Sequence, residues 1–407
     1  MTGQPEHVLV IGAGLGGVRT AEQLRTAGFQ GRISLVGAES HVPYDRPPLS
    51  KQILTGQWEP GRAILRTLDQ LEDLGVRAHL GLAAVALRPG EVELSDGSTL
   101  YGDATVVATG LVARRLPDQP AHVHTLRTLD DSLALRTTLE RAGSLLIVGA
   151  GFIGAEVATA ARARDIAVTV LEALPVPSLG PLGPAVGALA ARLLTEGGVD
   201  LRVDTAPTGF VEDSAPVAVR LPDGSVLTAD AGLVGIGGVP RLDWLRGAPA
   251  PAHDPARGLR CDPSGRVRGW DAVWAVGDVA LWEDPVDGTA HRHEHWTSAG
   301  DQAAVVARDI LGAAPPPPAV PYFWSDQFGL KIQLIGRTEG ADEVLPLHGS
   351  GLDGGPVRGT VAGYLTGDRL VAVVGFGTPR HVARYRALVA DRTPRPDVLA
   401  RAAELGP

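Results

Sequence analysis

Short apolar runs that end in glycine stand at two places in the sequence, and each is followed by a stretch with helical periodicity and a second apolar run. Runs of this kind are typical of strands buried on both faces of a parallel sheet. The order strand, helix, strand predicts two βαβ units with right-handed crossovers. The predicted elements cover 7–12, 16–27 and 32–36 in the first unit and 144–149, 153–164 and 168–171 in the second.

The same order of elements continues after each βαβ unit, so the repeat is longer than the units themselves. Apolar and polar residues alternate about a turn at 92–100 and 217–227, which predicts two hairpins. Further apolar runs at 105–110, 232–238 and 273–278 predict buried strands.

The last part of the chain has a different pattern. Four prolines at 315–318 predict a stiff, extended linker. Beyond them, apolar runs at 330–335, 357–365 and 370–376 and an arginine-rich helix near 380–390 predict a separate α+β domain.

Each βαβ unit carries a glycine fingerprint between its strand and its helix. The glycines are Gly12, Gly14 and Gly17 in the first unit and Gly149, Gly151 and Gly154 in the second, 137 positions apart (149 − 12). In such a fingerprint the first glycine permits a tight turn, the second lets a pyrophosphate approach the backbone, and the third lets the helix pack on the sheet. The phosphates then lie at a helix N-terminus. The pattern therefore predicts two dinucleotide sites, and electrons could pass from one dinucleotide to the other.

Composition narrows the function classes. The 407 residues carry a net charge of −9, which argues against a nucleic-acid partner because phosphate binding needs a basic face. The apolar stretch at 145–155 is too short to span a bilayer, and the first residues do not form a signal peptide, so we expect a cytoplasmic protein. Cys261 is the single cysteine, which excludes a redox-active dithiol within the chain.

An acidic residue near the end of the second strand is expected to bind the ribose hydroxyls of a dinucleotide. Glu172 lies 23 positions after Gly149 (172 − 149), directly after the predicted strand. Because a carboxylate there bonds a free 2′-hydroxyl and repels a 2′-phosphate, it favours NADH over NADPH. In the first unit the candidates are Glu39, 27 positions after Gly12 (39 − 12), and the neighbouring Ala38.

Four longer segments give a more specific signal, namely Tyr44-Asp-Arg-Pro-Pro-Leu-Ser-Lys51, Ala108-Thr-Gly110, Ala275-Val-Gly-Asp278 and Trp324-Ser-Asp-Gln327. With them the chain resembles, essentially end to end, the FAD- and NADH-dependent ferredoxin reductases of oxygenase systems, the group of putidaredoxin, rubredoxin and biphenyl dioxygenase reductases. The resemblance implies the glutathione reductase fold: α/β, with two Rossmann-like nucleotide-binding domains and a C-terminal α+β domain. The implied domains are FAD-binding (1–117 and 244–318), NAD-binding (118–243) and C-terminal (319–407).

The resemblance also implies roles for individual residues. Lys51 would lie near flavin N5, paired with Glu156, where its ammonium group stabilises the negative charge of the reduced flavin. Trp324 would lie near the nicotinamide and the flavin. The other implied FAD contacts are Gly12, Gly14, Leu15, Gly17, Ala38, Glu39, Arg46, Pro47, Ala84, Ala108, Thr109, Gly110, Arg127, Asp278, Glu294, His295 and Trp296. The implied NAD contacts are Gly149, Gly151, Ile153, Gly154, Glu172 and Gly237. His291, His293 and His295 alternate along the chain, but no cysteine or carboxylate set accompanies them, so we expect no metal site.

The implied reaction moves hydride from NADH to FAD and then single electrons to a [2Fe-2S] ferredoxin, which feeds a cytochrome P450 or a Rieske oxygenase. We expect a monomer with no membrane or nucleic-acid partner. Arg380, Arg384, Arg386, Arg392 and Arg395 are candidates for docking an acidic ferredoxin, and a solvated helix face is an equal alternative. Two other functions stay open: an NADH oxidase, peroxidase or monodehydroascorbate-type reductase, and a redox-sensing protein that resembles apoptosis-inducing factor. The oxidases and peroxidases of this fold use a cysteine near residues 40–50, where this chain has none.

Overall fold

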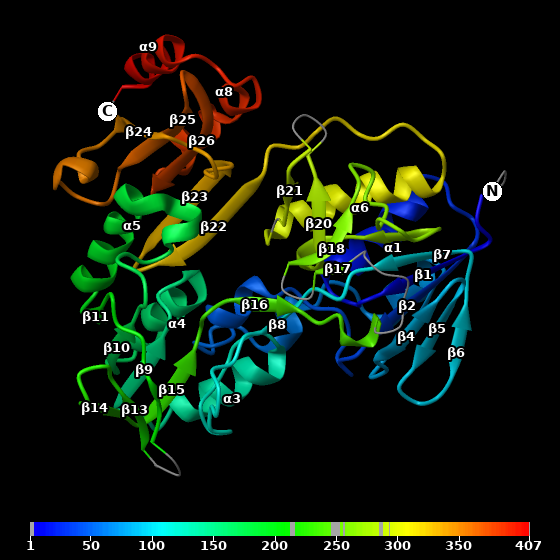
Figure 1. Cartoon of the computed structure of the whole chain (residues 1–407), viewed down its shortest axis with the longest axis horizontal. Helices are drawn as coiled ribbons and strands as arrows, with labels where there is room; N and C mark the ends of the chain where they lie inside the picture. Colours follow the sequence, from blue (N-terminus) through cyan, green and yellow to red (C-terminus); the bar gives the residue numbers. More distant parts are fainter. Residues whose placement is uncertain are drawn as a thin grey trace. The chain divides into compact units, whose positions relative to one another are not determined.

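The computed structural model describes residues 4–211, 216–245, 253–254, 257–284, 288–292 and 294–406. It has two compact units, each built from three separate stretches of chain (Figure 1). Unit 1 comprises Met1–Asp45, Pro60–Val112 and Gly238–Ala319, and unit 2 comprises Arg46–Glu59, Ala113–Gly237 and Val320–Pro407. Within the described ranges, no helix is long and apolar enough to cross a membrane.

Unit 1 is built on a parallel sheet in the order β19-β7-β1-β2-β3. Its strands are β1 (His7–Ile11), β2 (Arg32–Gly37), β3 (Val76–Leu80), β7 (Ala104–Val107) and β19 (Val273–Ala275). Helices α1 (Leu15–Thr26) and α6 (Trp296–Ile310) pack against each other, although 281 positions separate their first residues (296 − 15). Val8, Val10, Leu24 and Val306 are fully buried in their common core, which explains the apolar runs.

Smaller elements complete unit 1. An antiparallel sheet has the order β4-β5-β6, and its second pair is the hairpin predicted at 92–100. A further sheet has the order β17-β18-β20-β21. The bounds are α2 (Leu68–Asp73), β4 (Ala84–Arg88), β5 (Glu91–Leu94), β6 (Thr99–Tyr101), β8 (Leu111–Ala113), β16 (Gly238–Pro240), β17 (His253–Asp254), β18 (Gly258–Cys261), β20 (Ala280–Glu283) and β21 (Ala290–His291).

Unit 2 contains a second parallel sheet in the order β11-β10-β9-β15. Its strands are β9 (Ser144–Val148), β10 (Ala167–Leu171), β11 (Asp200–Arg202) and β15 (Ala231–Val234). The accompanying elements are α3 (Leu129–Leu139), α4 (Phe152–Arg162), α5 (Leu179–Glu196) and a small antiparallel sheet of β12 (Gly209–Phe210), β13 (Val217–Arg220) and β14 (Val226–Ala229). Strand β9 ends at Val148 and α4 begins four residues later, at Phe152 (152 − 148). Gly149 and Gly151 lie in the loop between them, as the second fingerprint predicts.

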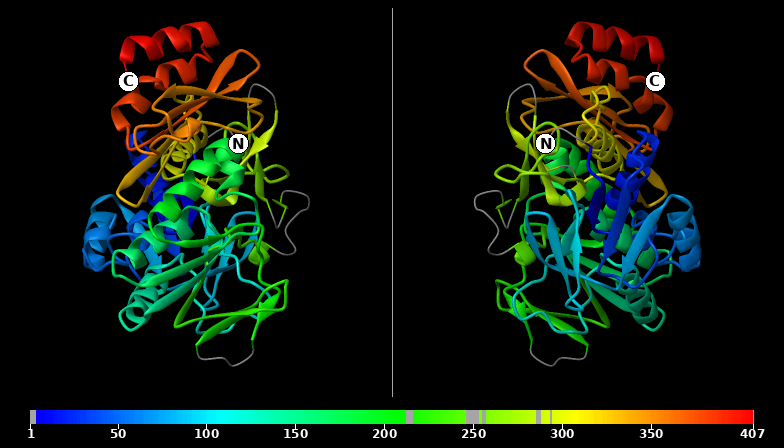
Figure 2. Two further views of the ribbon diagram at one scale, coloured as in Figure 1. Left: turned by 90° about the vertical axis from the view of Figure 1, so that its left-hand side faces the viewer. Right: turned by 90° about the vertical axis from the view of Figure 1, so that its right-hand side faces the viewer.

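The end of the chain forms an antiparallel sheet in the order β22-β23-β26-β25-β24. Its strands are β22 (Tyr322–Gln327), β23 (Leu330–Gly336), β24 (Glu343–His348), β25 (Val361–Thr366) and β26 (Arg369–Phe376). Apolar side chains of this sheet share a buried cluster with α5, including Leu189, Ile332 and Phe376. Helices α7 (Pro379–Arg384), α8 (Arg386–Ala390) and α9 (Arg395–Leu405) follow, and the red α9 lies beside the orange strands in both views of Figure 2.

The predicted fold class is confirmed, and three details of the C-terminal part are wrong. The strand predicted at 357–365 begins only at Val361. The single helix predicted near 380–390 is two short helices, α7 and α8, because the chain bends at Tyr385, whose fully buried ring anchors it. Strands β22 and β24 and helix α9 were not predicted. The three predicted domain boundaries stay a prediction, since unit 2 groups the second parallel sheet with the C-terminal sheet.

Candidate functional site

The first fingerprint forms an open cradle at the N-terminus of α1. Gly12 has a φ of +119°, and a Cβ there would lie 2.2 Å from the Ala108 carbonyl oxygen. A Cβ at Gly17 would lie 1.8 Å from the Gly12 carbonyl oxygen, so close packing requires both glycines. A Cβ at Gly14, in contrast, would meet no atom within 4 Å. The Thr109 hydroxyl is buried beside this loop, and the described residues offer it no hydrogen-bond partner. Open space, helix amides and a spare hydroxyl fit a bound pyrophosphate.

The second fingerprint repeats this cradle at the N-terminus of α4. Gly149 has a φ of +102°, and a Cβ there would lie 2.5 Å from the Gly235 carbonyl oxygen. A Cβ at Gly154 would lie 2.1 Å from the Gly149 carbonyl oxygen, whereas at Gly151 the nearest atom is 4.0 Å away. Ile153, in the first turn of α4, is 42% exposed although it is apolar. The cradle therefore has room for a second dinucleotide.

The candidate ribose acids differ between the two cradles. Glu172 is buried directly after β10, and its Oε2 accepts a 2.7 Å hydrogen bond from the Ala150 amide in the fingerprint loop. Its Oε1 accepts a 2.9 Å bond from the Leu174 amide. A carboxylate has about four acceptor sites, so these two bonds orient Glu172 and leave capacity for ribose hydroxyls. Glu39 lies two residues past β2 and accepts a hydrogen bond from the Tyr44 hydroxyl, and Ala38 is exposed.

Other predicted FAD contacts lie at the carboxyl ends of the unit 1 strands or at the start of α6. Asp278 belongs to a 3₁₀ turn three residues after β19, and the adjoining Gly277 amide donates to Gln302 of α6 at 2.7 Å. The Trp296 indole opens α6 and donates to Asp45 at 2.7 Å, and the Arg19 guanidinium lies 5.8 Å from its ring centre. The remaining predicted residues are placed as follows: Leu15 begins α1, Ala84 begins β4, Ala108, Thr109 and Gly110 follow β7, Glu294 pairs with Arg292, and His295 is the N-cap of α6.

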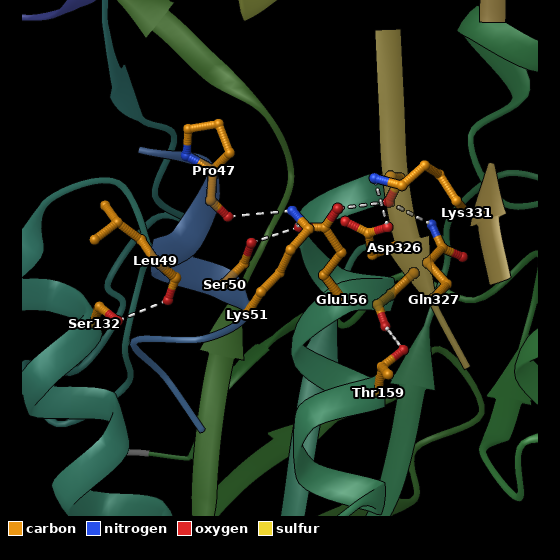
Figure 3. Close-up of polar contacts among 12 residues, drawn as sticks. Pro47, Leu49, Ser50, Lys51, Ser132, Glu156, Thr159, Asp326, Gln327 and Lys331 are labelled. Atoms are coloured by element: carbon orange, nitrogen blue, oxygen red, sulfur yellow. Dashed lines mark hydrogen bonds and ion pairs between the residues drawn. The ribbon is translucent and has the colours of Figure 1, made fainter. Parts of the chain in front are cut away.

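Lys51 and Glu156 form an ion pair inside unit 2, with 2.8 Å between Nζ and Oε2 (Figure 3). Lys51 directly follows the 3₁₀ helix Pro47–Ser50, and its ammonium group also donates to the Pro47 carbonyl at 3.2 Å. Glu156 lies in the second turn of α4 and is only 4% exposed. A buried carboxylate needs such partners, because desolvation of an unpaired charge is costly.

Two serines complete the hydrogen bonding of Glu156, and no sequence motif assigned a role to either of them. The Ser50 hydroxyl donates to Oε2, and the Ser325 hydroxyl of β22 donates to Oε1 at 2.5 Å. The Gln327 amide donates to the Ser325 oxygen at 3.0 Å. Both serines lie inside the segments 44–51 and 324–327 that carried the resemblance, so the signal was present but pointed to the neighbouring Lys51 and Trp324.

Trp324 and the two predicted arginines also lie in unit 2. The Trp324 ring stacks on Tyr322, with 5.9 Å between ring centres and 21° between planes, and the Lys331 ammonium lies 5.8 Å from it. Arg46 donates to the carbonyl of Arg127 at 2.5 Å, so these predicted FAD contacts meet each other. Gly237 has a φ of +90° and open space around it.

The described residues contain no group of three or more His, Cys, Asp or Glu side chains that could hold a metal ion. His291 bonds the Thr289 hydroxyl at 2.6 Å, and His293 lies outside the described residues. Cys261 is fully buried, and burial raises the pKa of its thiol well above the usual range, so it is a poor nucleophile.

Comparisons with known proteins agree with this geometry. Residues 6–303 match the family model "Pyridine nucleotide-disulphide oxidoreductase". The chain belongs to this family. Residues 322–404, which include the C-terminal sheet, match the model "Reductase C-terminal". Among pyridine nucleotide-disulphide oxidoreductases, this member has no second cysteine with which to form a disulphide.

Several relatives of this oxidoreductase are similar over nearly their whole length. The ferredoxin reductase component of a chlorobenzene dioxygenase from Cupriavidus sp. is 38% identical over 95% of this chain and 93% of its own. Putidaredoxin reductase from Pseudomonas putida is 32% identical over 96% and 93%. The structure of a covalent putidaredoxin reductase–putidaredoxin complex matches with a TM-score of 0.90 and 32% identity over 97% of this chain and 95% of that chain. The resemblance stated from the sequence is thus confirmed.

Proposed function

We propose that this chain is an FAD-dependent reductase that takes hydride from NADH and passes single electrons to a [2Fe-2S] ferredoxin, which supplies a cytochrome P450 or a Rieske oxygenase. The observation that carries the proposal is the pair of glycine cradles in a chain whose relatives are named ferredoxin reductases of dioxygenase systems. Putidaredoxin reductase is similar over nearly the same length.

The two cofactors are assigned by what surrounds each cradle. FAD is proposed at the cradle of unit 1, where Thr109 lies against Gly12 and the turn that holds Asp278 follows β19. NADH is proposed at the cradle of unit 2, where the Ala150 and Leu174 amides orient Glu172. A flavin supplies the chemistry that nicotinamide lacks, because it accepts two electrons together and releases them singly. Lys51 contributes a fixed positive charge near the flavin, and Glu156 holds that charge in place.

The electrons must leave this chain for a separate protein. With Cys261 as its single, buried cysteine, the chain has no dithiol to carry them further. Of the predicted docking arginines, Arg395 pairs with Glu343 and Arg386 donates to the Val320 carbonyl at 2.9 Å. Arg380 and Arg384 of α7 are exposed, and we propose that they and Arg386 steer an acidic ferredoxin. We further propose a monomer that works in the cytoplasm.

The test is NADH-driven reduction of cytochrome c with and without added [2Fe-2S] ferredoxins. Strong stimulation by one member of a ferredoxin panel is the expected result. Rapid NADH oxidation by oxygen alone would instead favour the oxidase alternative. A slow turnover with a long-lived charge-transfer complex would favour the redox-sensing alternative.

Neutralising Arg384 and Arg386 tests the proposed docking residues separately. R384Q/R386Q should slow ferredoxin reduction several-fold at low salt and flatten its salt dependence, because steering acts on the association rate. Reduction of a small artificial acceptor by NADH serves as the internal control and should not change. If the ferredoxin rate and its salt dependence stay as in the wild type, docking lies elsewhere.

A further inference from the structure

We propose that Ser325 is a positioning residue for the reaction described above: through Glu156 it fixes the Lys51 ammonium group. The inference rests on the proposed function, since the charge of Lys51 matters only if it acts on a flavin. If Ser325 has this role, the C-terminal sheet influences the reactivity of FAD in addition to any role in docking the ferredoxin.

The Glu156 carboxylate is held at both oxygens from two separate parts of unit 2 (Figure 3). Lys51 and Ser50 share Oε2 and belong to one short segment, while Ser325 reaches Oε1 from strand β22. Neither serine is solvated, because Ser325 is 0% exposed and Ser50 is 2% exposed. Among the described residues, Ser325 is the hydrogen-bond donor to Oε1 of Glu156. Water has no access to the Ser325 side chain, because that side chain is fully buried.

A second bonded oxygen changes what the carboxylate can do. The terminal torsion of a Glu side chain has a broad energy well, so a carboxylate bonded at one oxygen can turn about it. Bonds at both oxygens fix the plane of the group, and the plane fixes the place where Nζ of Lys51 lies. Without the Ser325 hydroxyl, Oε1 would be a buried charged atom with no donor, and Glu156 would turn to satisfy it. The Lys51 ammonium group would then shift with the Glu156 carboxylate.

The hydroxyl of Ser325 is itself oriented by its neighbour on the same strand face. A serine hydroxyl has one proton to donate. Because the Gln327 amide donates to the Ser325 oxygen at 3.0 Å, that proton is directed to Glu156. Asp326 lies between them on the opposite face of β22, where it pairs with Lys331 at 3.1 Å. Asp326 therefore offers a matched control on the same strand, outside the network.

The experiment compares FAD-loaded full-length wild type with S325A, S325T and D326N. In stopped flow with NADH, S325A should reduce its flavin about three- to tenfold more slowly, the effect of an ordinary net hydrogen bond, because Ser325 acts on the flavin only through Glu156 and Lys51. The flavin midpoint potential of S325A should become more negative, because the reduced flavin loses part of its positive neighbour. The KM for NADH should stay unchanged. S325T, which keeps the hydroxyl, should retain the wild-type potential, and D326N should match the wild type in both measurements.

A double-mutant cycle shows whether Ser325 acts through Lys51. In a K51M background the S325A substitution should change neither the rate nor the potential further. Wild-type values in S325A, or an undiminished effect of S325A in the K51M background, would overturn the proposal. A chemical titration of the potential needs neither NADH nor ferredoxin, so a failure of the proposed acceptor would be seen separately. S325A and S325T must also melt within a few degrees of the wild type, which checks that folding is retained.

Discussion

The β1–α1 loop of unit 1 and the β9–α4 loop of unit 2 share one architecture and differ in what surrounds it. In each loop the first and third glycines press against backbone oxygens, and the second faces open space. Two residues after the third glycine, however, the helices carry opposite charges, Arg19 in α1 and Glu156 in α4. The common cradle predicts phosphate binding in both units, whereas Arg19 and Glu156 make the surroundings of the two cradles different.

The two charged residues have different surroundings. Arg19 is about one-third exposed and pairs with Glu22 at 2.6 Å beside the Trp296 ring. Glu156 is buried and accepts bonds from Lys51 and two serines. An exposed pair such as the first contributes little to stability, whereas breaking a buried network leaves an uncompensated charge. We therefore propose that the function of unit 2 depends on this helix position as well as on the glycines.

The largest expected effect comes from filling the second glycine of each cradle. G14A and G151A place a methyl group where no atom comes closer than 4.0 Å, at backbone angles that alanine adopts, so both variants should fold. The methyl group would block a pyrophosphate. G14A should therefore be purified without FAD, and G151A should keep FAD while its KM for NADH rises at least about tenfold, a loss of ~1.4 kcal/mol. Flavin absorbance and steady-state kinetics measure the two effects.

Melting curves provide the control for these variants, since G14A apoprotein should be compared with wild type stripped of its cofactor. A G14A protein that retained FAD, together with a G151A protein that lost it, would reverse the assignment of the two cradles.

Local pattern predicted the central strands and the first helix of each βαβ unit because their signals lie within a few residues. The runs at 7–12 and 144–149 became β1 and β9 almost to the residue, since burial on both faces demands continuous apolar sequence. The edge strand β24 was missed because its exposure alternates irregularly and Pro346 interrupts it with a bulge. Helix α9 was missed because it buries few residues, among them Val398.

The candidate site was predictable only where a motif named the residue. Lys51 and Glu156 were paired through the resemblance, and the ion pair is present. Ser325 lies 169 positions from Glu156 (325 − 156), and no local pattern connects the two. The hydrogen bond depends on the way the C-terminal sheet packs on α5 and α4, which is a property of the folded core.

A smaller effect on kinetics should distinguish Glu172, which follows β10, from Glu39, which follows β2. Glu172 is oriented by the Ala150 and Leu174 amides, so E172Q should lower kcat/KM for NADH about tenfold, in keeping with the loss of a charge-assisted hydrogen bond. NADPH should be affected less, because the repulsion of its 2′-phosphate is removed as well. The matched variant E39Q changes an acid that accepts from Tyr44, and it should keep its FAD. Kinetics with both nucleotides and flavin content measure the outcome; an unchanged NADH preference in E172Q would remove Glu172 from the proposed site.

The smallest effect concerns the pH dependence of stability, to which both units contribute. Burial, more than any nearby charge, lowers the pKa of His79 in unit 1 and of His348 in unit 2. His348 bonds the Tyr385 hydroxyl at 2.7 Å, and burial raises the pKa of that tyrosine to about 12. Since folding favours neutral histidine, the unfolded chain binds more protons just below the ordinary value of about 6.5. Stability is therefore fully present above that pH and falls as the pH drops through the window toward the lowered values.

Single substitutions separate the contributions of the two units to this acid sensitivity. H79Q and H348Q should each lose fewer degrees of Tm than the wild type between about pH 7 and pH 5, by an amount on the order of a few degrees. The positive charge of His381, whose ring centre lies 4.7 Å from that of His348, is the second cause of the lowered pKa of His348. H381Q should therefore weaken the acid sensitivity in the same direction but by less than H348Q. Calorimetric melts at several pH values measure these slopes, and an H348Q slope as steep as that of the wild type would mean that folding does not lower the pKa of His348.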